Sequence, residues 1–515
     1  MPNQAHTWAE PDLYILADEE LIASSENAVR RTCAIEKQPE PVIVPDKPWE
    51  SAAPDGSVTS LQDPLYGTVL HDASEGIFRA WYNIYDRFAN RIYSPPVVDQ
   101  GYSCRYAVSD DGLNWEKPVI GEVLYNGSLG NNILRFKDIE TEGTSNLGEQ
   151  VWNVLPHSPS ERDCASGQTA SRCIVTGLPD GEDRFVASLQ SSYPDPLYTH
   201  GITMCYSPDG IHWRMHFPPV LTYEGDCHGF CWDPVSRCFL LTTRSHEYGN
   251  LCRRWGHAWK RHIALFKSRD LVHWTAATTI LEVDDKDPED AQLYLMYIIP
   301  NGHAYLGQLL MFYGHEMTLD VQLALSRDLA DWKRMPERVP ILARGEEGAW
   351  DCRHVALTHN PPHPEGDRMR FWYGGKNAPH YQAGYGALGT GTLRRDGFVC
   401  YEAGDEEGVV TTIPFRPPSP NSATHLILNV DASKGEALVE ITDTDGKPIE
   451  GATKADCMPI RGDHVRTVVN FKAGPGQYFS RGNFMRFAED VRFRFYLRNA
   501  KLYAFKAANY APQFS

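Results

Sequence analysis

Acidic and histidine side chains gather at three places in the chain, each directly ahead of a run of apolar residues. The three segments read EGDCH (224–228), DDKDPEDAQ (284–292) and WDCRH (350–354). Alternate residues of an extended segment share one face, so Asp226 and His228 would point the same way. Paired carboxyl groups can act as acid, base or nucleophile, and cleavage of a glycosidic bond requires such a pair.

A second pattern indicates which elements would position these residues. It is a Ser-x-Asp turn with a following tryptophan, and it occurs as CRYAVSDDGLNW (104–115), YSPDGIHW (206–213), SRDLVHW (268–274), SRDLADW (326–332) and a degenerate RRDGF (394–398). The Ser and Asp side chains can accept hydrogen bonds from backbone N–H groups two residues on. The tryptophan can then cover the turn, and the apolar run before each full copy reads as a strand that enters a hairpin.

Five copies of one supersecondary unit favour a five-bladed β-propeller, in which the first strand of each blade faces a common axis. Side chains at the starts of these first strands would then converge. The expected blades lie at about 61–118, 132–213, 220–274, 279–332 and 340–401, after an approach segment at 1–48.

The repeat stops after Gly404. A proline-rich stretch at 411–420 follows, and then segments that alternate apolar and polar residues, such as Leu426, Leu428 and Val430. Period-2 alternation with turn signals predicts an antiparallel β-sandwich. We therefore predict an all-β chain with two domains: a propeller catalytic domain at 1–410, approach segment included, and a β-sandwich at 411–515.

Composition narrows the set of partners. The 515 residues carry 49 Lys and Arg against 67 Asp and Glu, a formal net charge of −18. This charge argues against nucleic acid or an anionic membrane as a partner. No apolar run is long enough to cross a bilayer, and the first residues lack the basic start of a signal peptide. We expect a cytoplasmic protein; a secreted mature form and a homo-oligomer are left open.

Metal and cofactor motifs are scarce. The 12 cysteines include no C-x-x-C pair, so buried free thiols are favoured over a zinc site. The acidic segment 284–292 lacks the spacing of a Ca²⁺-binding loop, although a structural Ca²⁺ is left open. There is no G-x-S-x-G, H-E-x-x-H, phosphate-loop or dinucleotide-binding motif. We expect no cofactor.

Several longer stretches resemble a known group of proteins. They are PWE (48–50), YGTVL (66–70), AVSDDGLNWEKP (107–118), NNIL (131–134), SRD (326–328), GEEGAWD (345–351) and LNVD (428–431). They are similar to segments of the glycoside hydrolase clan that includes families 32 and 68; family 43 has the same propeller. The similarity is strongest to the family-32-like bacterial propeller proteins. The resemblance covers nearly the whole chain. It implies a five-bladed propeller followed by a sandwich, and glycosidase activity.

The resemblance also directs the choice of site residues. It places a first carboxylate at Asp63, although this residue also reads as a simple Asp-Pro turn. Together with the clusters above, it predicts Asp63, Asp226 and Asp351 as the catalytic carboxyl set. The predicted substrate-binding residues are Asn153, His228, Arg244, Asp290, Gln292, Trp350 and His354.

The predicted reaction is hydrolysis of a furanosidic or pyranosidic linkage in an oligosaccharide or glycoside. Carboxyl separations of about 5–5.5 Å or 6.5–9.5 Å would distinguish a retaining from an inverting enzyme. A non-catalytic carbohydrate-binding propeller is the alternative, because the expected blade-two strand offers Asn153 where an acid would be needed. A six-bladed sialidase-like fold fits the Asp turns but not the number of copies.

Overall fold

The computed structural model of the chain describes residues 13–50, 67–86, 101–123, 125, 127–138, 171–177, 183–192, 200–215, 220–222, 227–252, 257–301, 304–380, 382, 384–416, 425–472 and 490–508. The regular elements are strands and two 3-10 helices, η1 (Glu19–Leu21) and η2 (Pro48–Glu50). The predicted all-β class is confirmed. Among these residues, no helix has the length and apolar character that crossing a bilayer requires.

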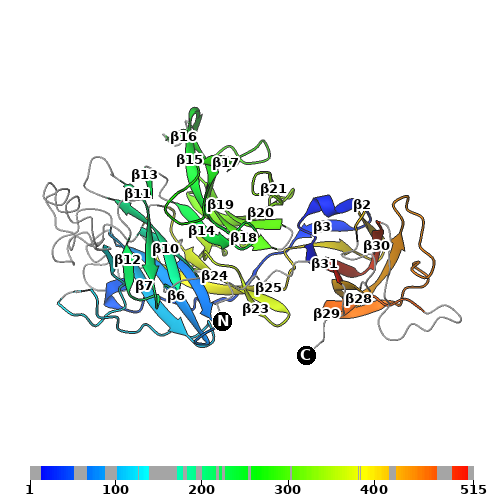
Figure 1. The fold of residues 1–515 in the computed structure, drawn as a ribbon, viewed down its shortest axis with the longest axis horizontal. Helices are drawn as coiled ribbons and strands as arrows, with labels where there is room; N and C mark the ends of the chain where they lie inside the picture. The colour runs from blue at the N-terminus through cyan, green and yellow to red at the C-terminus, as the bar shows by residue number, and fades with distance from the viewer. Residues whose placement is uncertain are drawn as a thin grey trace.

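Three separate sheets follow one another along residues 67–281, and we name them sets 1, 2 and 3 (Figure 1). Set 1 contains β5 (Gly67–Asp72), β6 (Ile77–Asp86) and β7 (Gly101–Ser109). Set 2 contains β8 (Phe136–Asp138), β9 (Ser171–Gly177), β10 (Phe185–Ser192), β11 (His200–Ser207), β12 (Trp213–Met215) and β13 (Leu221–Thr222). Set 3 contains β14 (His228–Asp233), β15 (Cys238–Cys252), β16 (His257–Ser268) and β17 (Thr278–Leu281).

Sets 4 and 5 are joined in one nine-stranded sheet. Set 4 contains β18 (Ala291–Asn301), β19 (Ala304–Tyr313), β20 (Thr318–Ser326) and β21 (Trp332–Arg334). Set 5 contains β22 (His354–Leu357), β23 (His363–Glu365), β24 (Arg368–Lys376), β25 (Gly386–Arg394) and the short β4 (Glu36–Lys37). The join is a parallel contact in which Leu319 of β20 lies opposite His354 of β22.

The sets contact one another in succession, and set 5 returns to set 1. β9 of set 2 lies against set 1 and against β14, and β18 of set 4 lies against β14, β15 and β16 of set 3. Set 5 reaches set 1 where the N–H of His359 donates to the carbonyl of Gly67 over 2.8 Å and the N–H of Val69 donates to Asn360 Oδ1 over 3.0 Å. A five-bladed propeller would require this closed order of contacts.

Strands that neighbours cover on both faces should read as continuous apolar runs rather than as an alternation. β18 has the sequence AQLYLMYIIPN, and all of its residues are buried. β20, with the sequence TLDVQLALS, is buried along its whole length as well. The core of sets 4 and 5 therefore lies on both sides of these strands.

The Ser-x-Asp turn forms the same hydrogen bonds in each full copy. In the second copy, Ser207 Oγ accepts from the N–H of Gly210 and Asp209 Oδ1 accepts from the N–H of Ile211, each over 2.8 Å. Trp213 Nε1 donates to the carbonyl of Gly210 over 3.0 Å. Equivalent bonds surround the aspartates of the other full copies, Asp111, Asp270 and Asp328. The turn hydrogen bonds predicted from the sequence are confirmed.

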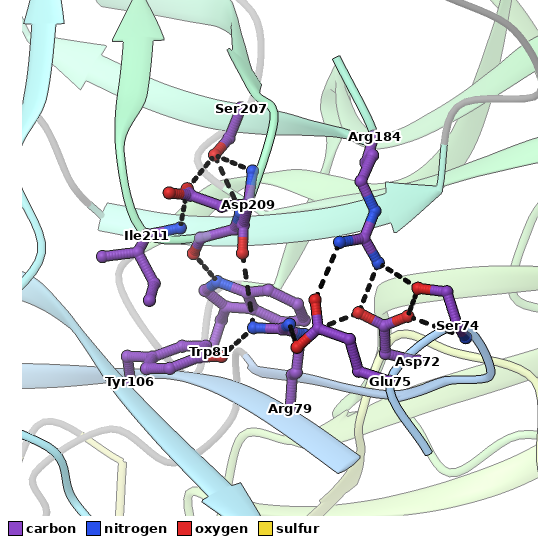
Figure 2. A network of polar contacts seen from close by, with 11 residues as sticks. Asp72, Ser74, Glu75, Arg79, Trp81, Tyr106, Arg184, Ser207, Asp209 and Ile211 are labelled. Carbon is purple, nitrogen blue, oxygen red and sulfur yellow. Dashed lines mark hydrogen bonds and ion pairs between the residues drawn. The ribbon is translucent and has the colours of Figure 1, made fainter. Parts of the chain in front are cut away.

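The same turn also joins neighbouring sets (Figure 2). Trp81 Nε1 on β6 of set 1 donates to the carbonyl of Gly210 in set 2 over 2.8 Å. Beside it, Arg79 forms an ion pair with Asp72 over 2.9 Å, and Arg184 of set 2 also reaches the Asp72 carboxylate. A buried tryptophan and a shared carboxylate therefore fix set 1 against set 2.

Sets 5 and 1 repeat this arrangement. Trp372 Nε1 on β24 donates to the carbonyl of Gly112, in the turn of set 1, over 2.8 Å. Trp372 and Trp81 occupy matching places in MRFWY (369–373) and FRAWY (78–82). The sequence similarity between the two segments therefore corresponds to one shared packing role.

The PWE and NNIL motifs meet beside set 1. The buried Glu50 carboxylate accepts from Tyr82 Oη over 2.7 Å and from Lys117 Nζ over 2.6 Å. Trp49 Nε1 donates to Asn132 Oδ1 over 2.6 Å, and Asn132 Nδ2 donates to Tyr82 Oη over 3.0 Å. These bonds satisfy a carboxylate that would otherwise be costly to bury, so the two motifs serve the fold.

A second nine-stranded sheet, the C-terminal sheet, lies at the right of Figure 1. Its strands are β1 (Leu13–Ile15), β2 (Ile22–Glu26), β3 (Val29–Thr32), β26 (Val399–Ala403), β27 (Gly408–Thr412), β28 (His425–Thr442), β29 (Ile460–Val468), β30 (Arg492–Arg498) and β31 (Ala500–Ala508). β28 pairs with β29, β30 and β31, and its buried side chains Leu428 and Val439 pack with Phe495 and Phe505.

This sheet includes segments that the sequence analysis assigned to the propeller domain. β2 pairs with β27, β3 pairs with β26 and β1 pairs with β31, so residues 13–32 and 399–412 belong to the C-terminal sheet. The chain then passes to β4, whose Lys37 lies opposite Gly391 on β25 of set 5. Strands of two to five residues carry too little periodicity to identify their partners from the sequence.

The degenerate fifth copy of the turn connects the two parts of the molecule. Asp396 has a positive φ of 56° and is buried, and its carboxylate forms an ion pair with Arg466 of β29 over 2.5 Å. Next to it, Arg394 bonds Asp463 over 2.5 Å and Asn429 over 2.7 Å. This turn therefore faces the C-terminal sheet instead of a neighbouring set.

Candidate functional site

Side chains from sets 3, 4 and 5 converge around one tyrosine, Tyr294. We name this group the Tyr294 cluster. Its members are Arg244 on β15, Arg261 on β16, Gln292 and Tyr294 on β18, His354 on β22, and His380 in the segment after β24. Tyr294 Oη and His380 Nε2 are 2.9 Å apart, and the His354 and His380 ring centroids are separated by 5.4 Å.

A β-bulge positions Tyr294. The register of β18 against β19 shifts between Leu293 and Leu295, which leaves Tyr294 as the extra residue. A bulge re-aims a side chain and bends its strand. The buried Tyr294 ring receives Arg244 on one side, with the guanidinium carbon 5.1 Å from the ring centroid, and Arg261 at 5.5 Å.

Arg261 and Gln292 are held by each other. Arg261 Nη1 donates to Gln292 Oε1 over 2.7 Å, and both residues are 4% exposed. Arg261 also lies over the Phe312 ring, 5.5 Å from the centroid. Two aromatic faces and one amide therefore hold this guanidinium in a fixed orientation.

The two histidines are neutral at neutral pH. Burial, followed by the charge of Lys376, lowers the pKa of His354 to about 3. Burial also holds the pKa of His380 well below its usual value, with His354, Lys376, Arg261 and Arg244 acting in the same direction. His354 Nε2 lies 3.0 Å from the carbonyl oxygen of Met317, so this nitrogen carries the proton and Nδ1 presents a lone pair.

The cluster brings together three of the predicted substrate-binding residues, Arg244, Gln292 and His354, each from a different set. Its donors and acceptors can bind hydroxyl or acidic oxygens, and its tyrosine and phenylalanine rings supply apolar surface. That these residues bind a substrate stays a prediction. Tyr294, Arg261 and His380 were not selected from the sequence, where Tyr294 reads as part of an apolar strand.

Asp351 and Trp350 have other contacts. The Asp351 carboxylate forms an ion pair with Lys37 Nζ over 2.6 Å and accepts from Tyr373 Oη over 3.2 Å. Trp350 stacks on the Tyr373 ring at 5.6 Å and donates from Nε1 to the carbonyl of Pro39 over 3.1 Å. These contacts hold the segment around β4 against set 5.

His228 and Asp290 also have contacts apart from the cluster. His228 is fully buried at the start of β14, and its Nε2 lies 2.9 Å from Ser188 Oγ on β10. Asp290, ahead of β18, accepts from the N–H of His315 over 2.8 Å and so closes the turn between β19 and β20. The remaining predicted residues, Asp63, Asn153 and Asp226, lie outside the described residues.

One further carboxyl group has an altered acidity. Burial raises the pKa of Asp320 to about 6, against the opposing effects of Arg344 and of a hydrogen bond from Tyr313. Tyr313 Oη and Asp320 Oδ1 are 3.3 Å apart. Asp320 follows Leu319, which faces His354 across the β20–β22 contact, so its own side chain lies on the opposite face of β20 from Leu319.

Within the part of the chain that the structure describes, no three His, Cys, Asp or Glu side chains gather in a way that could hold a metal ion. The cysteines whose side chains the structure describes are free thiols, and all of these except Cys33 are buried. This agrees with the thiols expected from the sequence.

No family model matches the chain. No curated protein matches it either. One similar solved structure comes from the GH130 family of mannoside phosphorylases, which contains glycoside hydrolases that target beta-1,2 mannosidic linkages in Candida mannan. It has 12% identity and a TM-score of 0.43, and the match covers 71% of this chain and 94% of that one. A β-1,2-mannobiose phosphorylase from Listeria innocua has 12% identity and a TM-score of 0.43, covering 70% of this chain and 96% of its own.

A thermostable family-43 glycoside hydrolase is also similar, with 12% identity and a TM-score of 0.41, covering 67% of this chain and 92% of its own. The names of these solved structures thus include glycoside hydrolases and phosphorylases, with family 130 named for one and family 43 for another. The resemblance to the family-32-like group stays a prediction.

Proposed function

We propose that this protein cleaves glycosidic bonds in an oligosaccharide or glycoside that binds at the Tyr294 cluster. One observation carries the proposal: Arg244, Gln292 and His354, selected from separate parts of the sequence, meet around one tyrosine. A site assembled from three sets, with aromatic faces beside fixed donors and acceptors, suits a sugar ring with its hydroxyl groups.

The reacting carboxyl groups in this proposal are Asp63 and Asp226. Asp63 precedes β5 of set 1 by four residues, counting from Gly67, and Asp226 precedes β14 of set 3 by two, counting from His228. One carboxyl would protonate the leaving oxygen, and the other would activate water or attack the anomeric carbon. The Asp351 carboxylate forms an ion pair with Lys37 that stabilises the fold, so we propose no reacting role for it.

The test is a panel of aryl glycosides and natural oligosaccharides, assayed with the wild type, Asp63→Asn, Asp226→Asn and the matched control Asp285→Asn. Asp285 is exposed in the acidic segment ahead of β18. We expect each of the first two variants to lower kcat by about 100-fold or more, since general acid–base groups contribute 10² to 10⁴. The control should match the wild type. Full activity in both variants would contradict the carboxyl assignment.

A second candidate is a carbohydrate-binding protein without hydrolase activity. It is favoured by the side chains described in the cluster, which are arginine, glutamine, tyrosine and histidine. If the wild type binds glycans from the panel, cleaves none of them, and loses binding in Gln292→Leu, this candidate replaces the first.

A further inference from the structure

Two guanidinium groups lie against the same aromatic ring in the Tyr294 cluster. The guanidinium carbons of Arg244 and Arg261 are 5.1 and 5.5 Å from the Tyr294 ring centroid. Two like charges that share one buried ring repel each other, and burial strengthens the repulsion. Arginine is also the residue whose planar fork matches a carboxylate or phosphate with two parallel hydrogen bonds.

Of the two arginines, Arg261 gives the stronger evidence for an anionic ligand. It is 4% exposed, and among the described residues it forms no ion pair; its hydrogen-bond partner there is the neutral amide of Gln292. A buried cation is costly unless it is paired. An anionic group on a bound ligand would provide the missing pair.

Three buried nitrogens of the cluster have no hydrogen-bond partner within the described residues. They are Arg261 Nε, Gln292 Nε2 and His354 Nδ1. Arg261 and Gln292 are bonded to each other, so their two unused N–H groups belong to one fixed pair of donors. Buried polar atoms are nearly always satisfied in folded proteins, so the unused N–H groups of Arg261 and Gln292 mark a place for ligand oxygens. His354 Nδ1 presents a lone pair and can accept a hydrogen bond from a hydroxyl group of the same ligand.

The surroundings keep this place electropositive. Burial is the main cause of the lowered pKa values of His354 and His380; the charge of Lys376 lowers both further, and Arg261 and Arg244 act in the same direction on His380. Among the described residues of the cluster, the charged side chains are therefore arginines, with Lys376 nearby, and the imidazoles add only hydrogen-bonding atoms. An oxyanion would be attracted, and a neutral ligand would leave Arg261 uncompensated.

We propose that the Tyr294 cluster binds an oxyanion, with Arg261 and Gln292 as its donors and Arg244 as a second positive charge. This inference rests on the proposed function and narrows its substrate class. The oxyanion would be the carboxylate of an acidic sugar or a separate inorganic phosphate ion, and the same donors serve both. Of the two sources, a carboxylate on the sugar itself would place the anion and the ring in one site.

The experiment measures binding to the full-length protein by calorimetry. The probes are glucuronate and galacturonate, their neutral counterparts glucose and galactose, and inorganic phosphate. We expect at least one uronate to bind at least about tenfold tighter than its neutral counterpart, since a charge-assisted hydrogen bond is worth about 1.5–3 kcal/mol. Raised ionic strength should weaken that preference.

Variants locate the binding. Arg261→Gln should remove the preference for the uronate, Arg261→Lys should keep part of it, and the exposed Arg416→Gln in the other part of the molecule should leave it unchanged. Arg261 is buried, so circular dichroism should verify that each variant is folded; the comparison of acidic and neutral sugars on the wild type stands without any variant.

The outcomes of the binding and cleavage experiments test the inference and the proposed function separately. Phosphate binding without uronate binding supports the oxyanion site and assigns it to free phosphate. Equal binding of uronates and neutral sugars, with no phosphate binding, overturns the inference, while cleavage of neutral glycosides in the panel would still support the proposed function. If the protein binds a uronate but cleaves no glycoside of the panel, the inference is supported and the proposed hydrolysis is contradicted.

Discussion

Tyr294 shows how one residue outside regular pairing can organise a site. Its neighbours on β18 pair in order with β19, and the bulge sets this side chain apart from them. The ring then receives two arginines and hydrogen-bonds a histidine that lies 86 positions further along the chain. In the sequence it is one apolar-looking residue in LYLMY (293–297), and nothing local distinguishes it. Only the tertiary contacts reveal it.

The sequence did predict Arg244, Gln292 and His354, because the repeat pattern places each near the end or the start of an expected strand, although Arg244 lies within the longer β15 of the structure. It also predicted Asp351, but that acid is engaged by Lys37, a residue more than 300 positions away. An acid beside a strand start looks the same in sequence whether a substrate or a lysine faces it. The partner decides the role, and partners this distant leave no local pattern.

Asp320 allows a prediction of pH dependence. Burial raises its pKa in the folded protein to about 6, against about 3.9 for an unperturbed aspartate in the unfolded chain. The protonated Asp320 therefore contributes its full stabilisation below a pH of about 4, and this contribution is lost as the pH rises through about 6. Asp320→Asn keeps an acceptor for Tyr313 but cannot ionise, so it should escape this loss, which amounts to about 2–3 kcal/mol.

Urea unfolding of the wild type and Asp320→Asn between pH 4 and pH 7 measures the effect. The midpoint of the wild type should fall relative to the variant across this range. The exposed Asp331→Asn, in the turn after β20, is the control and should follow the wild type. Parallel curves for wild type and Asp320→Asn would mean that Asp320 is already ionised at low pH.

At the scale of elements, the turn motif forms hydrogen bonds within itself and also contacts a neighbouring set. The bonds inside the turn can be predicted from the sequence, and they are present. The contact of Gly210 with Trp81 in the neighbouring set was not visible, because the two residues belong to different repeats. The third and fourth copies carry Leu271 and Leu329 at this position, each with a positive φ, so the turn shape is kept even where glycine is not.

Gly210→Ala tests the contact between sets 1 and 2. A Cβ at this position would lie 2.7 Å from Trp81 Cζ2, and the residue has a φ of +80°. Gly121 has a similar φ of +78° but open space around its added Cβ, so Gly121→Ala isolates the backbone cost. That cost should be about 1–2 kcal/mol, and overpacking against Trp81 should add about 1–3 kcal/mol.

The measurement is the thermal unfolding midpoint of both variants beside the wild type, with tryptophan fluorescence as a probe that includes Trp81. Gly210→Ala should unfold at a clearly lower temperature than Gly121→Ala. Equal midpoints would show that Trp81 shifts without cost, and the turn would then contribute little to the contact between sets.

At the scale of the whole molecule, the N-terminal segment connects the C-terminal sheet, set 5 and set 1. Residues 13–32 pair within the C-terminal sheet, β4 extends set 5, and η2 lies beside set 1. The sequence indicated a repeat array followed by alternating strands, because both patterns recur over many residues. It could not indicate that the first strands of the chain join the last ones, since short strands find their partners only when the whole chain has folded.

The ion pair between Lys37 and Asp351 is where this segment closes on set 5. The side chains are 21% and 4% exposed, so removing one partner leaves the other charge largely buried. Lys37→Met or Asp351→Asn should each destabilise the protein by about 3 kcal/mol. The double variant should lose less than the sum of the two, with a coupling energy of about 1–3 kcal/mol.

Arg368→Met is the matched control, because Arg368 pairs with Glu36 of the same β4 but the two side chains are 40% and 75% exposed. An exposed pair contributes about 0–1 kcal/mol, so this variant should unfold near the wild type. Turnover of Asp351→Asn, measured well below its unfolding midpoint, separates the two roles of Asp351. A structural role predicts wild-type kcat in the folded variant. A variant that is as stable as the wild type but inactive would return Asp351 to the reacting carboxyl set and leave the closure of the N-terminal segment to backbone pairing alone.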